Sequence, residues 1–267
     1  MLYNTKEQTI VLGNDRFNVI SFGYGEKVMV MIAGLNARDA KGKAAAMGLA
    51  ISYKDFTSDY TVYLFDRRET LPENFRIEDI AEDTARCMKY LGLRNAYVYG
   101  VSQGGMIAQC LAINHPELVK KLVLGVTASR INDTTRRKIE SWCAMADAGN
   151  LKGVLEDYFY ETYSEAYLKK FRRLIPMALK TAKFMKPARF SILAKSILSF
   201  DVYDRLNEIT CPVLVLGGKE DKIVTPEGSL EIAEKLGCEC FLYEGLGHSA
   251  YEEAPDFNDR VLRFFAD

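Results

Sequence analysis

Ser102 is the residue whose surroundings best fit a chemical role, in the stretch Gly100-Val101-Ser102-Gln103-Gly104. The apolar residues just before it predict a buried strand, and residues 106–113 predict a helix. A serine on a tight strand-to-helix turn projects its hydroxyl out of the sheet, and side chains two residues away on either side would collide. The G-x-S-x-G spacing in this context therefore predicts a nucleophilic serine. The amide N–H groups of the following helix would favour a developing negative charge.

A serine hydroxyl needs an adjacent base to become a nucleophile, and the chain contains two histidines. His115 comes about thirteen residues after Ser102, roughly 20 Å along the expected helix. It cannot reach back, so we interpret it as a structural residue at a helix end. His248 lies in a loop after the last expected strand and is the histidine that can serve as the base. A carboxylate must then fix its tautomer, and Asp221 and Glu220 are the rival candidates, both after a buried strand and a Gly-Gly turn.

Strands and helices alternate along most of the chain. Continuous apolar strands separated by amphipathic helices predict an α/β protein with a mostly parallel sheet that is covered on both faces. The expected strands are residues 8–13, 16–23, 28–34, 60–66, 96–101, 120–128, 211–218 and 238–244. The expected helices outside the long helical segment are residues 41–53, 76–93, 106–113, 226–236 and 254–267.

The alternation is interrupted by one long helical segment. We therefore expect an α/β core of residues 1–130 and 207–267, with residues 131–206 inserted as a helical cap or lid that packs on it. Its many aromatic side chains are expected mainly to form the core of this segment and its contact with the sheet. Its basic stretch, residues 169–173, predicts a solvated helix face. The aromatic residues are Trp142, Tyr158, Phe159, Tyr160, Tyr163, Tyr167, Phe171, Phe184 and Phe190.

Composition and charge narrow the expected partners and location. A formal net charge of −1 gives no reason to expect nucleic acid or an anionic membrane as a partner. No window reaches the roughly 18 apolar residues of a membrane span, and the polar start lacks a signal peptide's apolar stretch, so we expect a cytoplasmic protein. The six cysteines are interpreted as buried or half-buried thiols. Cys238 and Cys240 lack a second ligand pair, so no metal site is expected.

Four segments of the chain resemble the α/β-hydrolase superfamily, and together they extend the likeness over essentially the whole chain. They are "GVSQGG", "NHPELVKKLVL", "CPVLVLGGKEDKIVTP" and "GLGHSAYEEAPDFNDRVLRFF". The resemblance implies the α/β-hydrolase fold, an eight-stranded, mostly parallel sheet flanked by helices, with a helical lid inserted after the sixth strand. The order serine, aspartate, histidine matches that family. Its G-x-x-D segment, here residues 218–221, favours Asp221 over Glu220.

The same resemblance implies an oxyanion hole made of two backbone N–H groups. One belongs to Gln103, directly after the serine, and the other comes from the loop after the third strand. By position we assign the second to Leu35, with Asn36 as the rival. Two segments depart from the family pattern: Ala33-Gly34 stands where relatives usually have His-Gly, and Asp66-Arg67-Arg68-Glu69 stands where they have D-x-R-G.

We therefore predict a serine hydrolase that cleaves a carboxylic ester or lactone of a small or medium acyl substrate through Ser102, His248 and Asp221. The resemblance also permits cleavage of a thioester, hydrolysis of a carbon–carbon bond or removal of an N-terminal residue from a peptide. A nucleophilic serine counts against dehalogenases and epoxide hydrolases of this family, which use aspartate. A third possibility is a non-catalytic ligand-binding protein. No metal or organic cofactor is needed, and the substrate-binding residues and oligomeric state stay open.

Overall fold

The sheet of this protein contains eight strands in the order β1-β2-β4-β3-β5-β6-β7-β8 within residues 2–36 and 42–267, which the computed structural model describes. The β1–β2 and β2–β4 pairs are antiparallel, and all other neighbours are parallel. This confirms the prediction of an eight-stranded, mostly parallel sheet. The strands are β1 (Lys6–Leu12), β2 (Asp15–Phe22), β3 (Lys27–Ile32), β4 (Tyr60–Phe65), β5 (Ala96–Val101), β6 (Val119–Gly125), β7 (Val213–Gly218) and β8 (Glu239–Tyr243).

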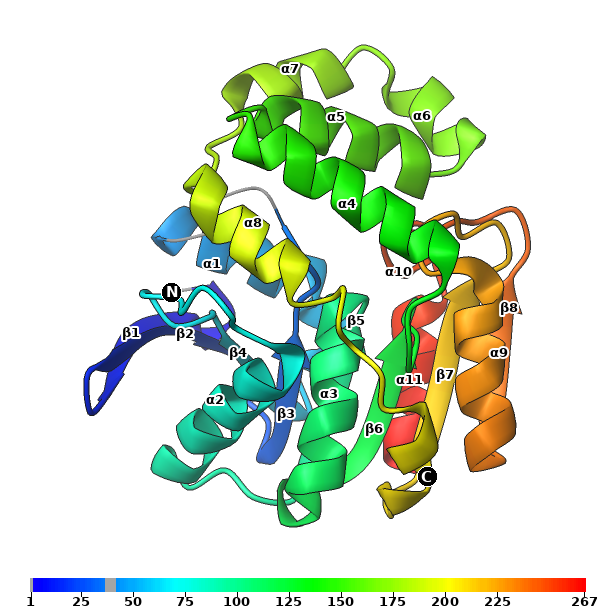
Figure 1. The fold of residues 1–267 in the computed structure, drawn as a ribbon. Coiled ribbons are helices and arrows are strands. Elements are labelled where there is room, and N and C mark those ends of the chain that lie inside the picture. The colour runs from blue at the N-terminus through cyan, green and yellow to red at the C-terminus, as the bar shows by residue number, and fades with distance from the viewer. Residues whose placement is uncertain (1, 37–41) are drawn as a thin grey trace.

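Helices cover both faces of the sheet, and each face has its own apolar cluster (Figure 1). One face carries α2 (Ile77–Tyr90), α3 (Gln103–Asn114) and α9 (Thr225–Leu236). The other carries α1 (Lys43–Ser52) and α11 (Phe257–Ala266). Because both faces are covered, every residue of β5 and of β7 is buried. Burial on both sides explains why these strands read as continuous apolar runs rather than as alternating ones.

Five helices lie between β6 and β7, over the end of the sheet where the parallel strands finish (Figure 1). The first and last of them pack together and join the main core through Ile139, Trp142 and Phe190. The middle of the segment has a small cluster of its own, centred on Leu155 and Ile175. These inserted helices are α4 (Asp133–Asp147), α5 (Leu151–Thr162), α6 (Glu165–Phe171), α7 (Ile175–Thr181) and α8 (Pro187–Lys195).

The structure differs from the expected elements in a few places. The expected helix 254–267 begins only at Phe257, as α11, and the separate short helix α10 (Ala250–Glu253) precedes it. Ala254 is extended because Pro255 disfavours helical backbone at the residue before it. The expected helix 41–53 begins at Lys43, and residue 41 lies outside the described residues. The remaining short elements are 3₁₀ turns: η1 (Leu2–Asn4), η2 (Lys54–Phe56), η3 (Pro116–Leu118) and η4 (Tyr203–Glu208).

Over residues 2–36 and 42–267, no helix has both the length and the apolar character needed to cross a bilayer.

Candidate active site

Ser102 lies between β5 and α3 in a backbone conformation that residues with side chains seldom adopt. Its φ of 53° and ψ of −125° fall outside the regions that L-residues favour. A Cβ added to Gly100 would lie 2.4 Å from the carbonyl oxygen of Gly104, and one added to Gly104 would lie 1.9 Å from that of Ile32. Backbone therefore occupies the space on both sides of the turn, which is the steric reason for a glycine at each position.

Hydrogen bonds from the neighbouring strand hold this turn in place. The Ser102 N–H donates to the carbonyl oxygen of Gly125, at 2.9 Å. The Thr127 hydroxyl donates to the Ser102 carbonyl oxygen at 2.7 Å. Both partners lie at the end of β6 or just beyond it, so the parallel pairing of β5 with β6 fixes where the serine stands.

The structure brings Ser102, His248 and Asp221 into one line of hydrogen bonds. The Ser102 Oγ lies 2.9 Å from Nε2 of His248, and Nδ1 of the same ring lies 2.8 Å from Oδ2 of Asp221. The His248 and Asp221 side chains are each only 2% exposed. A carboxylate can only accept hydrogen bonds, so Nδ1 carries a proton and Nε2 is left to accept one from the serine.

Asp221 is itself held by the backbone after β7. Its Oδ1 accepts hydrogen bonds from the N–H groups of Ile223 at 2.8 Å and Val224 at 3.1 Å. With one oxygen on these two N–H groups and the other on His248, the carboxylate has a single orientation. Its neighbour Glu220 is exposed to solvent and makes none of these contacts. The two rival carboxylates thus differ in burial, because Asp221 is buried and Glu220 is exposed.

His115 lies away from this group of residues. It follows the last residue of α3, and its Nε2 lies 2.7 Å from Oε2 of Glu82 on α2. Its Nδ1 lies 3.0 Å from Nζ of Lys89. The geometry fits the sequence interpretation of His115 as a helix-end residue that joins two helices.

The loop that carries His248 is docked on the inserted helices. The Ser249 N–H donates to the carbonyl oxygen of Thr162 at 3.0 Å, and their hydroxyls are also 3.0 Å apart. The N–H of Ser164 donates to Oε1 of Glu253, at 2.9 Å. These contacts join the end of α5 to the loop and the start of α6 to α10, so the position of His248 depends on the insertion.

The residues expected to donate N–H groups to an oxyanion, Gln103 and Leu35, lie beside the serine. Leu35 and its rival Asn36 line the same cavity as Ser102. A Cβ on Gly34 would lie 3.1 Å from the Ser102 Cβ, so this loop passes directly beside the serine. Gln103 is the first residue of α3, and an N–H in the first turn of a helix has no partner within the helix. Residues 37–39 of the expected loop lie outside the described residues.

Arg67, which follows β4, forms a hydrogen bond to the loop after β3, a role that the sequence analysis missed. Its Nη2 donates to the carbonyl oxygen of Ala33 at 2.7 Å and lies 3.5 Å from Oε1 of Gln103. Burial lowers the pKa of the Arg67 guanidinium to about 10. The side-chain amide of Gln103, through Nε2, in turn donates to the carbonyl oxygen of Leu193 in α8, at 2.7 Å. The segment after β4 thus supplies one hydrogen bond to the loop after β3 and a contact to the start of α3.

A cavity of about 210 Å³ opens next to Ser102 and His248. Its walls include aromatic side chains of the insertion, which we expected mainly to form a core. That expectation was incomplete, because α4, α5 and α8 lie over the strand ends where Ser102 stands and therefore present part of their apolar surface to the cavity. The sequence analysis also missed Tyr251 and Glu252, three and four residues after His248. The insertion's aromatic residues in the wall are Trp142, Tyr158, Phe159, Tyr163 and Phe190.

Neither the cysteines nor the basic segment enters this site. All six cysteines are free thiols, and burial raises the pKa of Cys240 to about 11. Across residues 2–36 and 42–267, no group of three or more His, Cys, Asp or Glu residues is placed to hold a metal ion. The Lys169, Lys170, Arg172 and Arg173 side chains are exposed to solvent on and after α6.

Comparison with known proteins defines the class to which this fold and site belong. The family described as "alpha/beta hydrolase fold" matches residues 48–255, which is most of the chain. The chain belongs to this α/β-hydrolase family.

Two similar proteins are named "Putative carbamate hydrolase RutD". The protein from Rhizobium rhizogenes is 24% identical over 250 residues, which cover 87% of this chain and 95% of that protein. The protein from Caulobacter segnis is 27% identical over 253 residues, which cover 90% of this chain and 91% of that protein.

Solved structures show the same fold at lower sequence identity. The enol-lactonase from Burkholderia xenovorans matches with a TM-score of 0.85 at 17% identity, covering 97% of this chain and 100% of that chain. The esterase from Exiguobacterium antarcticum matches with a TM-score of 0.81 at 18% identity, covering 98% of this chain and 100% of that chain. These likenesses concern the architecture alone.

Proposed function

We propose that this protein is a serine hydrolase that cleaves a carboxylic ester or lactone of a small or medium acyl substrate. One observation carries the proposal: Ser102, His248 and Asp221 form a continuous line of hydrogen bonds that ends at an apolar cavity. A strained serine with a buried base and a fixed carboxylate is the arrangement that acyl transfer requires. The inserted helices α4 to α8 act as the lid over this cavity.

The reaction proceeds in two acyl-transfer steps. Ser102 Oγ bonds to the carbonyl carbon of the substrate while its proton passes to Nε2 of His248. The tetrahedral intermediate then collapses, and the same proton passes to the leaving alkoxide, which departs as an alcohol. Water next attacks the acyl-enzyme, again giving its proton to His248, and the acid is released as Ser102 regains a proton. Asp221 stabilises the imidazolium in both steps.

Backbone N–H groups stabilise the negative oxygen of each intermediate. The Gln103 N–H and the Leu35 N–H are the proposed donors, with Asn36 as the rival for the second position. Fixed donors of this kind act where charge develops and can contribute about 3 kcal/mol or more each. The hydrogen bond from Arg67 to the Ala33 carbonyl supports the loop that carries the second donor.

Hydrolysis of a carbamate is a second candidate function. It is favoured by the two relatives named for that activity, which match this chain over 87% and 90% of its length. The same serine would attack the carbamate carbonyl, and the same oxyanion donors would serve. A screen that pairs acyl esters and lactones with carbamates of equal size separates the two candidates.

Labelling with a fluorophosphonate probe tests the proposal before any substrate is known. We expect mass spectrometry of the digested protein to find the adduct on Ser102 and on no other residue, because only an activated serine reacts at a useful rate. The Ser102→Ala variant should take up no probe while keeping the wild-type circular dichroism spectrum. A folded wild-type protein that takes up no probe would contradict the proposal and favour a ligand-binding protein.

A further inference from the structure

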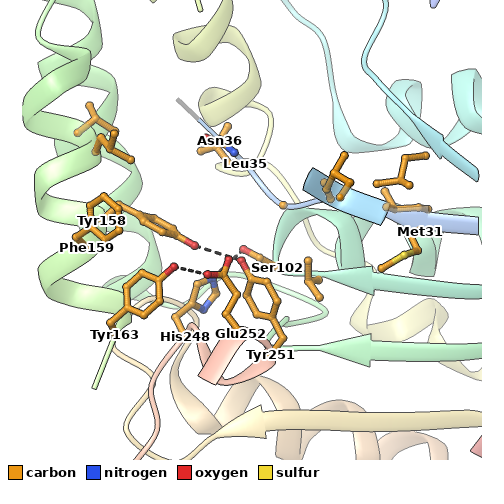
Figure 2. A pocket seen from close by; sticks show the side chains of 18 of the residues that line it. Met31, Leu35, Asn36, Ser102, Tyr158, Phe159, Tyr163, His248, Tyr251 and Glu252 are labelled. Atoms are coloured by element: carbon orange, nitrogen blue, oxygen red, sulfur yellow. Dashed lines mark hydrogen bonds between the residues drawn. The ribbon is translucent and has the colours of Figure 1, made fainter. Parts of the chain in front are cut away.

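The cavity beside Ser102 combines aromatic walls with one fixed negative charge. Among the described residues that line it, Glu252 is the one carboxylate, and no lysine or arginine is present. Figure 2 shows Glu252 beside His248 and opposite Tyr158 and Tyr163, which face it from α5 and from the residue after it. A ligand in this cavity therefore meets a negative field and π-faces.

Glu252 is exposed to solvent, but a hydrogen bond holds its carboxylate in position and leaves it able to accept further hydrogen bonds. It lies on the short helix α10 and accepts a hydrogen bond from the Tyr163 hydroxyl (Figure 2). An ionised carboxylate offers about four lone-pair sites, so further donors can bind it. Its neighbour Glu253 does not line the cavity and instead holds Ser164 at the start of α6. Glu253 thus joins α10 to the start of α6 without lining the cavity.

The aromatic rings near Glu252 form a connected group. The Trp142 and Tyr158 ring centroids are 6.1 Å apart, and those of Phe159 and Tyr163 are 5.6 Å apart. The Tyr158 and Tyr251 hydroxyls lie 3.3 Å apart across the cavity, between the insertion and α10 (Figure 2). Aromatic faces attract cations, and the attraction strengthens where the cation is partly desolvated.

A second observation at this cavity concerns the Tyr99 hydroxyl. The Tyr99 side chain lines the same cavity and is 2% exposed, and its hydroxyl has no hydrogen-bond partner among the described residues. Burial, and then the nearby Tyr53 and Glu252, raise the pKa of this hydroxyl, so it lies within the field of that carboxylate. A buried hydroxyl without a partner is costly, and its oxygen can accept a hydrogen bond from a bound donor.

We propose that the substrate of this site carries a cationic amine nitrogen, which Glu252 and the aromatic walls bind while Ser102 attacks the carbonyl. This inference rests on the proposed function and specifies its substrate class. A carboxylate or phosphate on the substrate would be repelled by Glu252, and no basic residue among those described in the wall would offset that repulsion. A neutral alkyl group would gain nothing from the charge of the carboxylate.

Two matched pairs of small probes test this inference on the whole protein. Choline is compared with 3,3-dimethylbutan-1-ol, in which carbon replaces the charged nitrogen, and butylammonium is compared with butan-1-ol. Dissociation constants come from ligand-observed NMR and from the slowing of fluorophosphonate labelling. We expect the cation to bind about tenfold more tightly than its neutral partner in at least one pair.

Two glutamate variants separate a charge effect from a structural one. Glu252→Gln keeps an oxygen for the Tyr163 hydroxyl but removes the charge, and it should abolish the preference for the cation. Glu253→Gln, the matched control, should retain the preference. Equal binding of cation and neutral probe by the wild type, or an unchanged preference in Glu252→Gln, would overturn the inference.

The labelling rate of Ser102 keeps the two proposals apart. Normal labelling without a cation preference overturns the amine specificity alone. A cation preference that Glu252→Gln abolishes, in a protein whose Ser102 does not react, supports the cation site and overturns the hydrolase proposal.

Discussion

At the scale of single residues, the site depends on side chains that each have one fixed task. Asp221 is the clearest example, because its Oδ1 accepts hydrogen bonds from two backbone N–H groups and its Oδ2 is hydrogen-bonded to His248. A carboxylate held on both sides fixes the imidazole tautomer that leaves Nε2 free for Ser102. In the proposed mechanism, the negative charge of Asp221 also stabilises the imidazolium form of His248.

We predict that Asp221→Asn slows fluorophosphonate labelling of Ser102 by about 10³- to 10⁴-fold. An amide cannot stabilise the imidazolium, and its NH₂ group favours the wrong histidine tautomer. Glu220→Gln is the matched control and should label at the wild-type rate, because Glu220 is exposed. If Asp221→Asn kept more than a tenth of the wild-type rate, or if Glu220→Gln were the slow variant, the assignment of the carboxylate would be wrong.

At the scale of secondary-structure elements, the strand-to-helix turn at Ser102 is the critical feature. It places the start of α3 against the end of β3, and Gly104 lies where the two backbones approach most closely. Packing of a helix this near to a strand is possible only without a Cβ. By contrast Gly48, within α1, has nothing within 4 Å of its Cβ position and is exposed.

These two glycines should therefore respond in opposite ways to the same substitution. Gly104→Ala should lower the free energy of unfolding by about 3 kcal/mol or more, since the obstacle is a backbone carbonyl rather than a flexible side chain. Gly48→Ala should raise it by up to about 1 kcal/mol, because alanine is the better helix former. Urea unfolding followed by circular dichroism measures both values. Equal stability of the two variants would argue against this close approach of β3 and α3.

At the scale of the whole molecule, burial controls the chemistry of the thiols as well as that of the site. Cys87 and Cys110 lie inside the core that joins α2 and α3 to the sheet. Burial raises the pKa of each to about 12, from an ordinary value of 9.0. The thiolate is the reactive form, so a raised pKa lowers the reactive fraction at any pH below it. Cys211 and Cys238 are only half-buried.

We expect iodoacetamide at pH 8 to modify the native protein at Cys211 and Cys238 well before Cys87 and Cys110. Burial also raises the pKa of Cys211, to about 11, and that of Cys238. At pH 8 about one thiol in 10³ ionises when its pKa is 11, against about one in 10⁴ when its pKa is 12, and the half-buried thiols are also more accessible to the reagent. Peptide mass spectrometry over time gives the rate at each position. In urea the four rates should converge, and a native Cys87 that reacts as fast as Cys238 would contradict the burial of the core.

The sequence by itself determined the features that depend on local sterics and on periodicity. The mostly parallel sheet follows from continuous apolar runs between amphipathic helices, and the family resemblance added the number of strands. The turn at Ser102 is visible because the glycines that it needs lie within two residues. The departure at Ala33-Gly34 is visible in the sequence, but the hydrogen bond from Arg67 to the Ala33 carbonyl is not.

Only the tertiary structure decided which distant residues meet. Ser102 and His248 are 146 positions apart, and their contact depends on β5, the loop after β8 and the docking of that loop on the insertion. Burial of Asp221 but not Glu220, the reach of Arg67 to Ala33, and the meeting of Glu252 with Tyr163 are likewise consequences of packing. Local sequence cannot encode such contacts, because each depends on how separate elements are placed around one sheet.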